Sequence, residues 1–98
     1  MKRIFAKSTL VEYWQTHPDT EQCLKIWYKT ILMNDFKSPA EIKLVFGTAS
    51  ILKNGRIVFN IKGNSHRLIA QFDFGKQLVY IRFVGTHKEY DRINANTI

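Results

Sequence analysis

The stretch RIVFNIKGNSHRLIAQFDFGKQLVYIRFV, residues 56–84, decides the fold of this chain. Apolar and polar side chains alternate along three runs within it, which are separated by Gly63-Asn64 and by Gly75-Lys76. Alternation with a period of two is typical of β-strands, and short breaks of this composition are typical of hairpin loops. The stretch therefore predicts an antiparallel meander of three strands.

Two-residue loops at these breaks set the register of the predicted strands. The first loop places Asn60 opposite Arg67, and the second places Leu68 opposite Phe83. The predicted core face then consists of Ile57, Phe59, Ile61, Leu68, Ala70, Phe72, Val79, Ile81 and Phe83. The opposite face collects Arg56, Val58, Asn60, Lys62, Arg67, Ile69, Gln71, Tyr80 and Arg82. A slip of one residue would bury the arginines, so the pattern specifies the register strongly.

The N-terminal half of the chain has the apolar spacing of helices. Residues 7–17 and 19–34 each carry an apolar stripe, and Ser8 stands where it could cap the first of these helices. A short helix is predicted for residues 38–46, with Ser38 as its cap. The expected fold is therefore α+β, with N-terminal helices packed on one face of a mainly antiparallel sheet. A further short strand over residues 3–6 is only weakly indicated.

Length and composition narrow the class of protein. Ninety-eight residues, of which 45% are hydrophobic, predict one domain covering residues 1–98. Cys23 is the only cysteine, so an internal disulfide is excluded. The chain contains no apolar run suited to a signal peptide or a membrane span, which predicts a cytoplasmic protein without a membrane role.

The chain is basic, and its charge is uneven. Its net charge is +7, and residues 53–92 hold eight Lys or Arg against three Asp or Glu. A basic field of this size favours a polyanionic partner, most simply nucleic acid or an acidic protein. Solubility alone is the alternative explanation.

Two arginines lie close together on the polar face of the predicted sheet. Arg67 and Arg82 fall nearly side by side on neighbouring strands, with Asn60 opposite Arg67. Two neighbouring guanidinium groups repel each other unless an anion lies between them, and a phosphate is a natural choice. The alternative is a solvated sheet face with scattered charges, which is common in antiparallel sheets.

The segment RFVGTHKEYD, residues 82–91, follows the last predicted strand and favours the first alternative. Thr86 and Glu89 have the spacing of a capping box, so they predict a short C-terminal helix whose free N–H groups could bind an anion. His87 at the helix start can exchange protons near neutral pH, and Tyr90 follows within a turn. Such a histidine is more often merely exposed than catalytic; its closeness to the arginines favours catalysis.

The remaining histidines predict structural roles. His66 falls on the core-facing side of a strand, and His17 precedes Pro18 and is expected to end a helix. Three scattered histidines and one cysteine match no metal-ligand spacing, so no metal or other cofactor is expected. RNA carries its own nucleophile, the 2′-hydroxyl, and can be cleaved by phosphate binding and proton transfer alone. Metal-independent RNA cleavage is thus the chemistry that these side chains fit best.

Several blocks of the sequence resemble one protein family. RIVFNIKGN (residues 56–64), RLIAQFDF (67–74) and VYIRFVGTHKEYDRI (79–93) are similar to the HigB toxins, which are RelE-like mRNA interferases of type II toxin–antitoxin systems. SPAEIKLVF (38–46) and TASILKNGR (48–56) also look like the family's middle region. The resemblance implies a RelE-like fold and cleavage of messenger RNA on the translating ribosome. It also implies a HigA-like helix-turn-helix antitoxin, through which alone the toxin would contact operator DNA.

The resemblance also suggests residue roles. The catalytic set would be Arg67, Arg82, His87 and Tyr90, and the RNA-binding set would be Asn60, Lys62, Asn64 and Lys88. The arginines would hold the scissile phosphate, while His87 would act as general acid or base with Tyr90 as its helper or substitute. His66 and Arg92 depart from the Tyr and Lys expected in relatives, and neither departure removes a proposed catalytic group. A non-catalytic RNA- or antitoxin-binding module is the alternative function.

Overall fold

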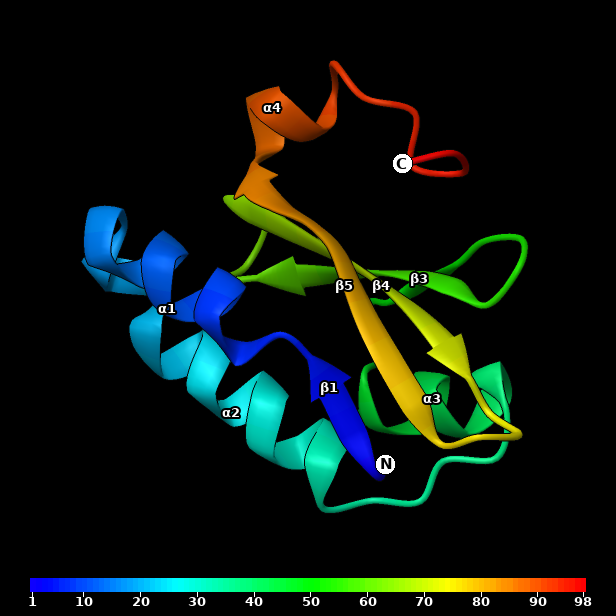
Figure 1. The fold of residues 1–98 in the computed structure, drawn as a ribbon. Coiled ribbons are helices and arrows are strands. Elements are labelled where there is room, and N and C mark those ends of the chain that lie inside the picture. Colours follow the sequence, from blue (N-terminus) through cyan, green and yellow to red (C-terminus); the bar gives the residue numbers. More distant parts are fainter.

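A computed structural model describes all of residues 1–98 (Figure 1). Its elements in chain order are β1 (Arg3–Phe5), α1 (Lys7–Thr16), the 3₁₀ turn η1 (Pro18–Thr20), α2 (Glu21–Leu32), α3 (Pro39–Val45), β2 (Ser50–Ile51), β3 (Arg56–Ile61), β4 (His66–Asp73), β5 (Leu78–Thr86) and α4 (His87–Tyr90). The five strands form one sheet in the order β1-β5-β4-β3-β2. The predicted α+β class, the meander and the short C-terminal helix are confirmed.

The sheet is mixed because its two outer strands come from outside the meander. The weakly indicated N-terminal strand exists as β1, which pairs in parallel with β5. The sequence did not indicate β2, which pairs antiparallel with β3 through only two residues. A strand this short has too few residues for an alternating pattern to be recognised.

The predicted register holds over most of the meander. Asn60 lies opposite Arg67, and Phe72 lies opposite Val79, as the hairpin loops require. The pairing of Leu68 with Phe83 was wrong, because a bulge between Ile69 and Ala70 shifts the ladder by one residue. Leu68 faces Val84 instead, and Arg82 is the extra residue on β5.

The core lies between one face of the sheet and the helices. It includes Leu10 of α1, Leu24, Trp27 and Ile31 of α2, Ile42 of α3, and Ile57, Phe59, Leu68, Phe72 and Val79 of the strands. The predicted stripe of residues 19–34 is thus the buried face of α2. Ser38 caps α3 as predicted, whereas Ser8 does not cap α1, because that helix already begins at Lys7. None of the helices has the length and apolar character needed to cross a bilayer.

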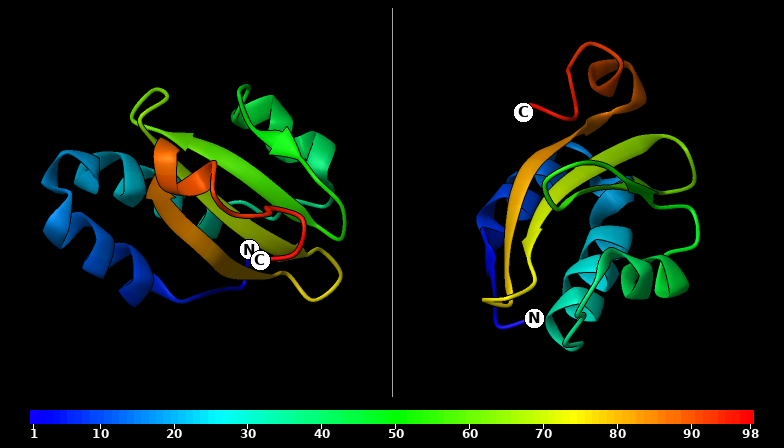
Figure 2. Two further views of the ribbon diagram at one scale, coloured as in Figure 1. Left: turned by 90° about the horizontal axis from the view of Figure 1, so that it is seen from above. Right: turned by 90° about the vertical axis from the view of Figure 1, so that its right-hand side faces the viewer.

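The opposite face of the sheet is partly covered by the C-terminal segment. Val58 and Ile69 are 4% and 0% exposed, although they lie outside the core cluster. After α4 the chain turns back across this face, and the Arg56 side chain donates to the backbone oxygen of Ile98 over 3.2 and 3.0 Å (Figure 2). Phe83 belongs to this side as well, with its ring 6.5 Å from that of Tyr90. The bulge therefore moves Phe83 away from its predicted place in the core.

Candidate functional site

The start of α4 is held firmly at the end of β5. Thr86 accepts a hydrogen bond from the Glu89 backbone N–H, and the Glu89 carboxylate accepts one from the Thr86 N–H over 2.8 Å, so the predicted capping box is confirmed. These bonds, the backbone one first, lower the pKa of the Glu89 carboxyl. The His87 N–H donates to Ser65 over 3.0 Å. The expected anion site at this helix start is therefore wrong in part, because two of its N–H groups are already used.

His87 is paired with a carboxylate. Its Nδ1 lies 3.0 Å from Oδ2 of Asp91, one helical turn later, and the two side chains are 42% and 58% exposed. A carboxylate on one ring nitrogen fixes the ring's orientation and leaves Nε2 for an external partner. The sequence analysis did not assign Asp91 a role, although its spacing of four residues from His87 is the signal that pairs side chains on a helix.

Arg67 lies at the same corner of the molecule. Its guanidinium donates to the side chain of Asn64 and, over 3.1 Å, to the Asn64 carbonyl. It also lies over the Tyr90 ring, 5.6 Å from the centroid. Because Arg67 faces Gly85 across the ladder, one residue before the Thr86 cap, the hairpin and α4 bring Arg67, Tyr90 and His87 together.

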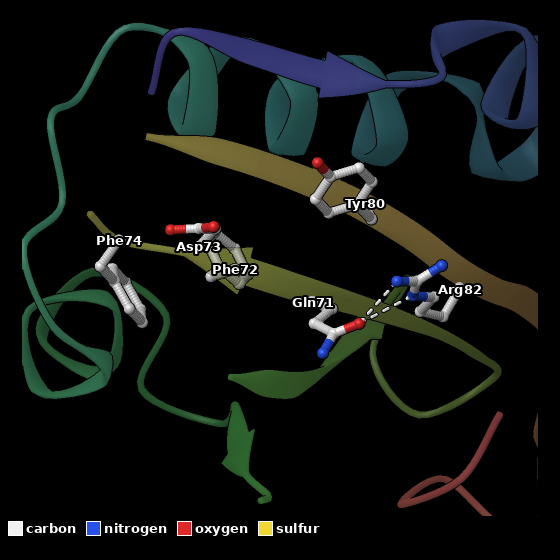
Figure 3. Close-up of a pocket in the computed structure, with 6 residues that line it drawn as sticks. All are labelled: Gln71, Phe72, Asp73, Phe74, Tyr80 and Arg82. Atoms are coloured by element: carbon white, nitrogen blue, oxygen red, sulfur yellow. Dashed lines mark hydrogen bonds between the residues drawn. The ribbon is translucent and has the colours of Figure 1, made fainter. Parts of the chain in front are cut away.

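Arg82 lies elsewhere on the sheet face, so its predicted position beside Arg67 was wrong. Its Nε and a terminal nitrogen both donate to Oε1 of Gln71, over 2.9 and 2.7 Å (Figure 3). Its guanidinium also lies 5.2 Å from the ring centroid of Tyr80. The bulge is the cause, because it inserts Arg82 into β5 and adds one residue between the two arginines.

The predicted RNA-binding residues occupy different surroundings. Lys88 is exposed on α4, and Asn64 holds Arg67. Lys62 is bound to Asp19, with Nζ 3.5 Å from Oδ2. Asn60 donates to the Thr48 carbonyl over 3.4 Å, toward β2 rather than toward the corner. Only Lys88 and Asn64 therefore adjoin the cluster around His87.

A polar network that the sequence did not predict lies beneath the hairpin. The Tyr13 hydroxyl is 2.7 Å from Nδ1 of His66, whose Nε2 is 3.7 Å from the Asp19 carboxylate. Tyr13 and His17 stack with ring centroids 4.1 Å apart. His66 is 6% exposed, in agreement with its predicted structural role, and His17 ends α1 as expected.

The pKa shifts of this network fit its hydrogen bonds. Burial, and then the carboxylates of Glu89 and Asp19, raise the pKa of Tyr13 to about 12. Burial opposes ionisation of Asp19, yet the Lys62 ammonium and other donors outweigh it and lower the pKa of that carboxyl. A neutral Tyr13 donating to Nδ1, with the His66 Nε2–H toward Asp19, satisfies all three groups. The helical spacing of Tyr13 and His17 was the only sequence signal for this network.

The corner around His87 has the groups needed for phosphate chemistry. Arg67 supplies positive charge and planar donors, which suit a phosphate. His87 presents one ring nitrogen to solvent, and the phenol of Tyr90 is three residues away on the same helix. No group of three or more His, Cys, Asp and Glu side chains is placed to hold a metal ion. The arrangement can bind an anion and exchange a proton with it.

Comparisons with known proteins agree with this arrangement. Residues 20–93 match the model of the HigB toxin family, described as the RelE-like toxic component of a toxin–antitoxin system. The mRNA interferase toxin HigB of Escherichia coli K12 is 34% identical over 94 residues, covering 94% of this chain and 90% of the relative. The mRNA interferase HigB of Shigella flexneri matches equally well. The one from Escherichia coli O6:H1 is 27% identical over 92 residues, 92% of this chain and 89% of the relative. The chain therefore belongs to the HigB family of RelE-like toxins, as the sequence blocks predicted.

Proposed function

We propose that this chain is an endoribonuclease that cleaves messenger RNA on the translating ribosome. The observation that carries the proposal is the pairing of His87 with Asp91 at an exposed corner that also holds Arg67 and Tyr90. The names of the relatives, mRNA interferases, support the same activity. A proton-transfer group oriented by a carboxylate beside an arginine is the set that cleavage by the RNA's own 2′-hydroxyl requires.

The proposed reaction needs no metal and no water. The 2′-oxygen bonds to phosphorus as its proton leaves, and the bond from phosphorus to the 5′-oxygen breaks as that oxygen takes up a proton. The products are a 2′,3′-cyclic phosphate and a 5′-hydroxyl end. His87 and Tyr90 are the groups placed to exchange these protons, and Arg67 stabilises the added charge on the phosphorane.

The remaining predicted residues act on the RNA around the cleaved bond. Lys88, exposed on α4, contacts a neighbouring phosphate, and Asn64 holds Arg67 in place. Arg82 binds a phosphate farther along the sheet, because Gln71 holds it away from the corner. Lys62 and Asn60, which have intramolecular partners, contribute less to RNA binding than Lys88 does.

The proposed setting is that of a toxin–antitoxin pair. Its partner is a HigA-like antitoxin with a helix-turn-helix domain, and the toxin reaches operator DNA only through that complex. Its place of action is the cytoplasm, where ribosomes translate the target. The net charge of +7 supports binding to ribosomal and messenger RNA.

The test is mapping of messenger-RNA cuts on translating ribosomes by primer extension, with wild type, His87→Ala and Lys29→Ala. Lys29 is exposed on α2, far from α4, and is the control for loss of one polar surface side chain. We expect cleavage by His87→Ala to fall roughly 100-fold or more while ribosome binding persists. Melting temperatures check that the variants remain folded.

Each other outcome leads to a definite conclusion. Cuts that persist in His87→Ala would retain the endoribonuclease and assign the proton transfer to Tyr90. No cuts from folded wild type, on ribosomes or on free RNA, would refute the proposal. In that case the chain would be a binding module for RNA or for its antitoxin.

A further inference from the structure

Four side chains form a ladder across the two outermost strands on the side of β1. The Arg3 guanidinium lies 4.9 Å from the ring centroid of Phe5, and the Phe5 and Tyr80 rings stack 5.4 Å apart with an interplanar angle of 13°. Arg82 lies 5.2 Å from the Tyr80 centroid on the next rung. β1 brings Arg3 and Phe5 here because Ile4, between them, points into the core. Arginine planes interleaved with aromatic rings are a platform on which nucleic-acid bases stack.

One hollow beside the ladder is aromatic and contains a single carboxylate. It has a volume of about 510 Å³ and is lined by Gln71, Phe72, Asp73, Phe74, Tyr80 and Arg82 (Figure 3). Oδ1 of Asp73 accepts from the Lys76 N–H over 3.0 Å, while Oδ2 makes no hydrogen bond. A carboxylate repels phosphate but accepts hydrogen bonds from the N–H groups of a base. This hollow therefore suits a base and not a phosphate.

A second hollow, on the other side of the stacked rings, has the opposite character. Lys2, Arg3 and Lys76 contribute three cations to its lining, together with Phe5, Gly75 and Leu78, and none of the lining residues is acidic. All three cationic side chains are exposed. Exposed lysines and arginines without carboxylates attract phosphate groups of nucleic acid. Phe5 lines this hollow and Tyr80 lines the first, so the stacked pair connects the two.

We propose that these two hollows and the ladder between them form a subsite for one nucleotide of single-stranded RNA. The base stacks at Tyr80 and Arg82 and donates to Asp73, while its phosphate lies between Arg3 and Lys76. The subsite lies at the start of β5, and the candidate active site lies at its end, about 20 Å away at the usual rise of a strand. It binds RNA flanking the cleaved bond. The choice of RNA as ligand rests on the proposed function.

The test is binding of a 2′-O-methyl single-stranded oligonucleotide, which cannot be cleaved through its 2′-oxygen, followed by fluorescence anisotropy. Tyr80→Leu removes the stacking ring but keeps an apolar side chain, and we expect a loss of affinity of roughly 5- to 100-fold. Tyr80→Phe keeps the ring and is the matched control, with affinity within about twofold of wild type. Arg3→Ala, at an exposed position of an outer strand, is the second variant and is expected to weaken binding without affecting folding.

Asp73→Asn distinguishes a bound base from a bound phosphate. Asn can still accept from the Lys76 N–H, but it carries no charge. With a base in the first hollow, the substitution changes the preference among oligonucleotides of different base composition. With a phosphate there, it strengthens binding of all of them equally, which would overturn the proposed placement.

The outcomes also separate this proposal from the proposed function. Wild type that cuts messenger RNA, with Tyr80→Leu and Arg3→Ala binding the oligonucleotide as well as wild type does, would overturn the subsite alone. Wild type that cuts nothing, but binds the oligonucleotide through Tyr80 and Arg3, would refute the proposed function and leave the subsite standing. Loss of binding in Lys29→Ala as large as in Arg3→Ala would reduce the effect to net charge and also refute the subsite.

Discussion

Replacement of Tyr13 by phenylalanine removes one oxygen atom from the network that anchors the β3–β4 hairpin. The Tyr13 hydroxyl lies 2.7 Å from Nδ1 of His66, and His66 is 6% exposed. Without the hydroxyl, this nitrogen is left inside the protein without a partner. Leaving a buried polar group unpaired costs about 1–3 kcal/mol, and the half-buried position of Tyr13 favours the lower part of that range. We expect the free energy of unfolding to fall by about 1–2 kcal/mol.

Urea unfolding and thermal melting measure this change. A loss of that size corresponds to a melting temperature lower by roughly 5–10 °C for a domain of this length. Tyr28→Phe is the matched control, because Tyr28 also packs against the core but its hydroxyl makes no hydrogen bond. The control is expected to change the free energy of unfolding by less than about 0.5 kcal/mol.

A double-mutant cycle with His66→Leu isolates the pair. If the two side chains stabilise the fold through their hydrogen bond, the effects of Tyr13→Phe and His66→Leu are not additive, and the coupling energy is about 1 kcal/mol. Additive effects, or a loss in Tyr13→Phe no larger than that in Tyr28→Phe, would refute the reasoning. In that case the stacked and edge-on contacts of the rings, which phenylalanine retains, would anchor the hairpin.

Three further predictions concern α4. The folded pKa of Glu89 is lowered from its ordinary 4.5, so its contribution to stability is present above that value and lost as pH falls through the folded pKa. The stability difference between wild type and Glu89→Gln, followed by urea unfolding, should therefore be largest above about pH 5 and shrink on acidification; a constant difference contradicts this. Asp91→Asn should lower kcat for RNA cleavage on the order of 10-fold with little change in KM, because it disturbs the orientation of His87; an effect on KM alone would count against it. Lys88→Ala should reduce the salt-dependence slope of oligonucleotide binding by about 0.7, equally for all sequences; an unchanged slope would exclude a phosphate contact.

Much of the fold followed from periodicity. The alternation in residues 56–84 predicts three strands and the pairing of Asn60 with Arg67, because a one-residue slip would bury charges. Thr86 and Glu89 predict the start of α4 because a capping box is local, involving residues only three apart. The two-residue strand β2 was not predictable in this way, because its pairing with β3 depends on tertiary packing.

The candidate site was predicted in composition but not in arrangement. Arg67, His87 and Tyr90 do meet, because a hairpin and a helix start meet at one end of the sheet. Arg82 does not join them, because a bulge carries it toward Gln71. A bulge leaves the pattern of apolar and polar residues readable on either side of it, so the sequence showed no sign of this one.

The sequence by itself determined which segments are strands and helices, which faces they bury and where α4 begins. These features depend on side-chain periodicity and on hydrogen bonds between residues a few positions apart. Only the tertiary structure decided that Tyr13 supports His66, that Phe5 stacks on Tyr80 and that the two arginines separate. Such contacts join residues far apart in the chain, or depend on a one-residue shift in a ladder, and their positions are set by how the sheet twists and packs.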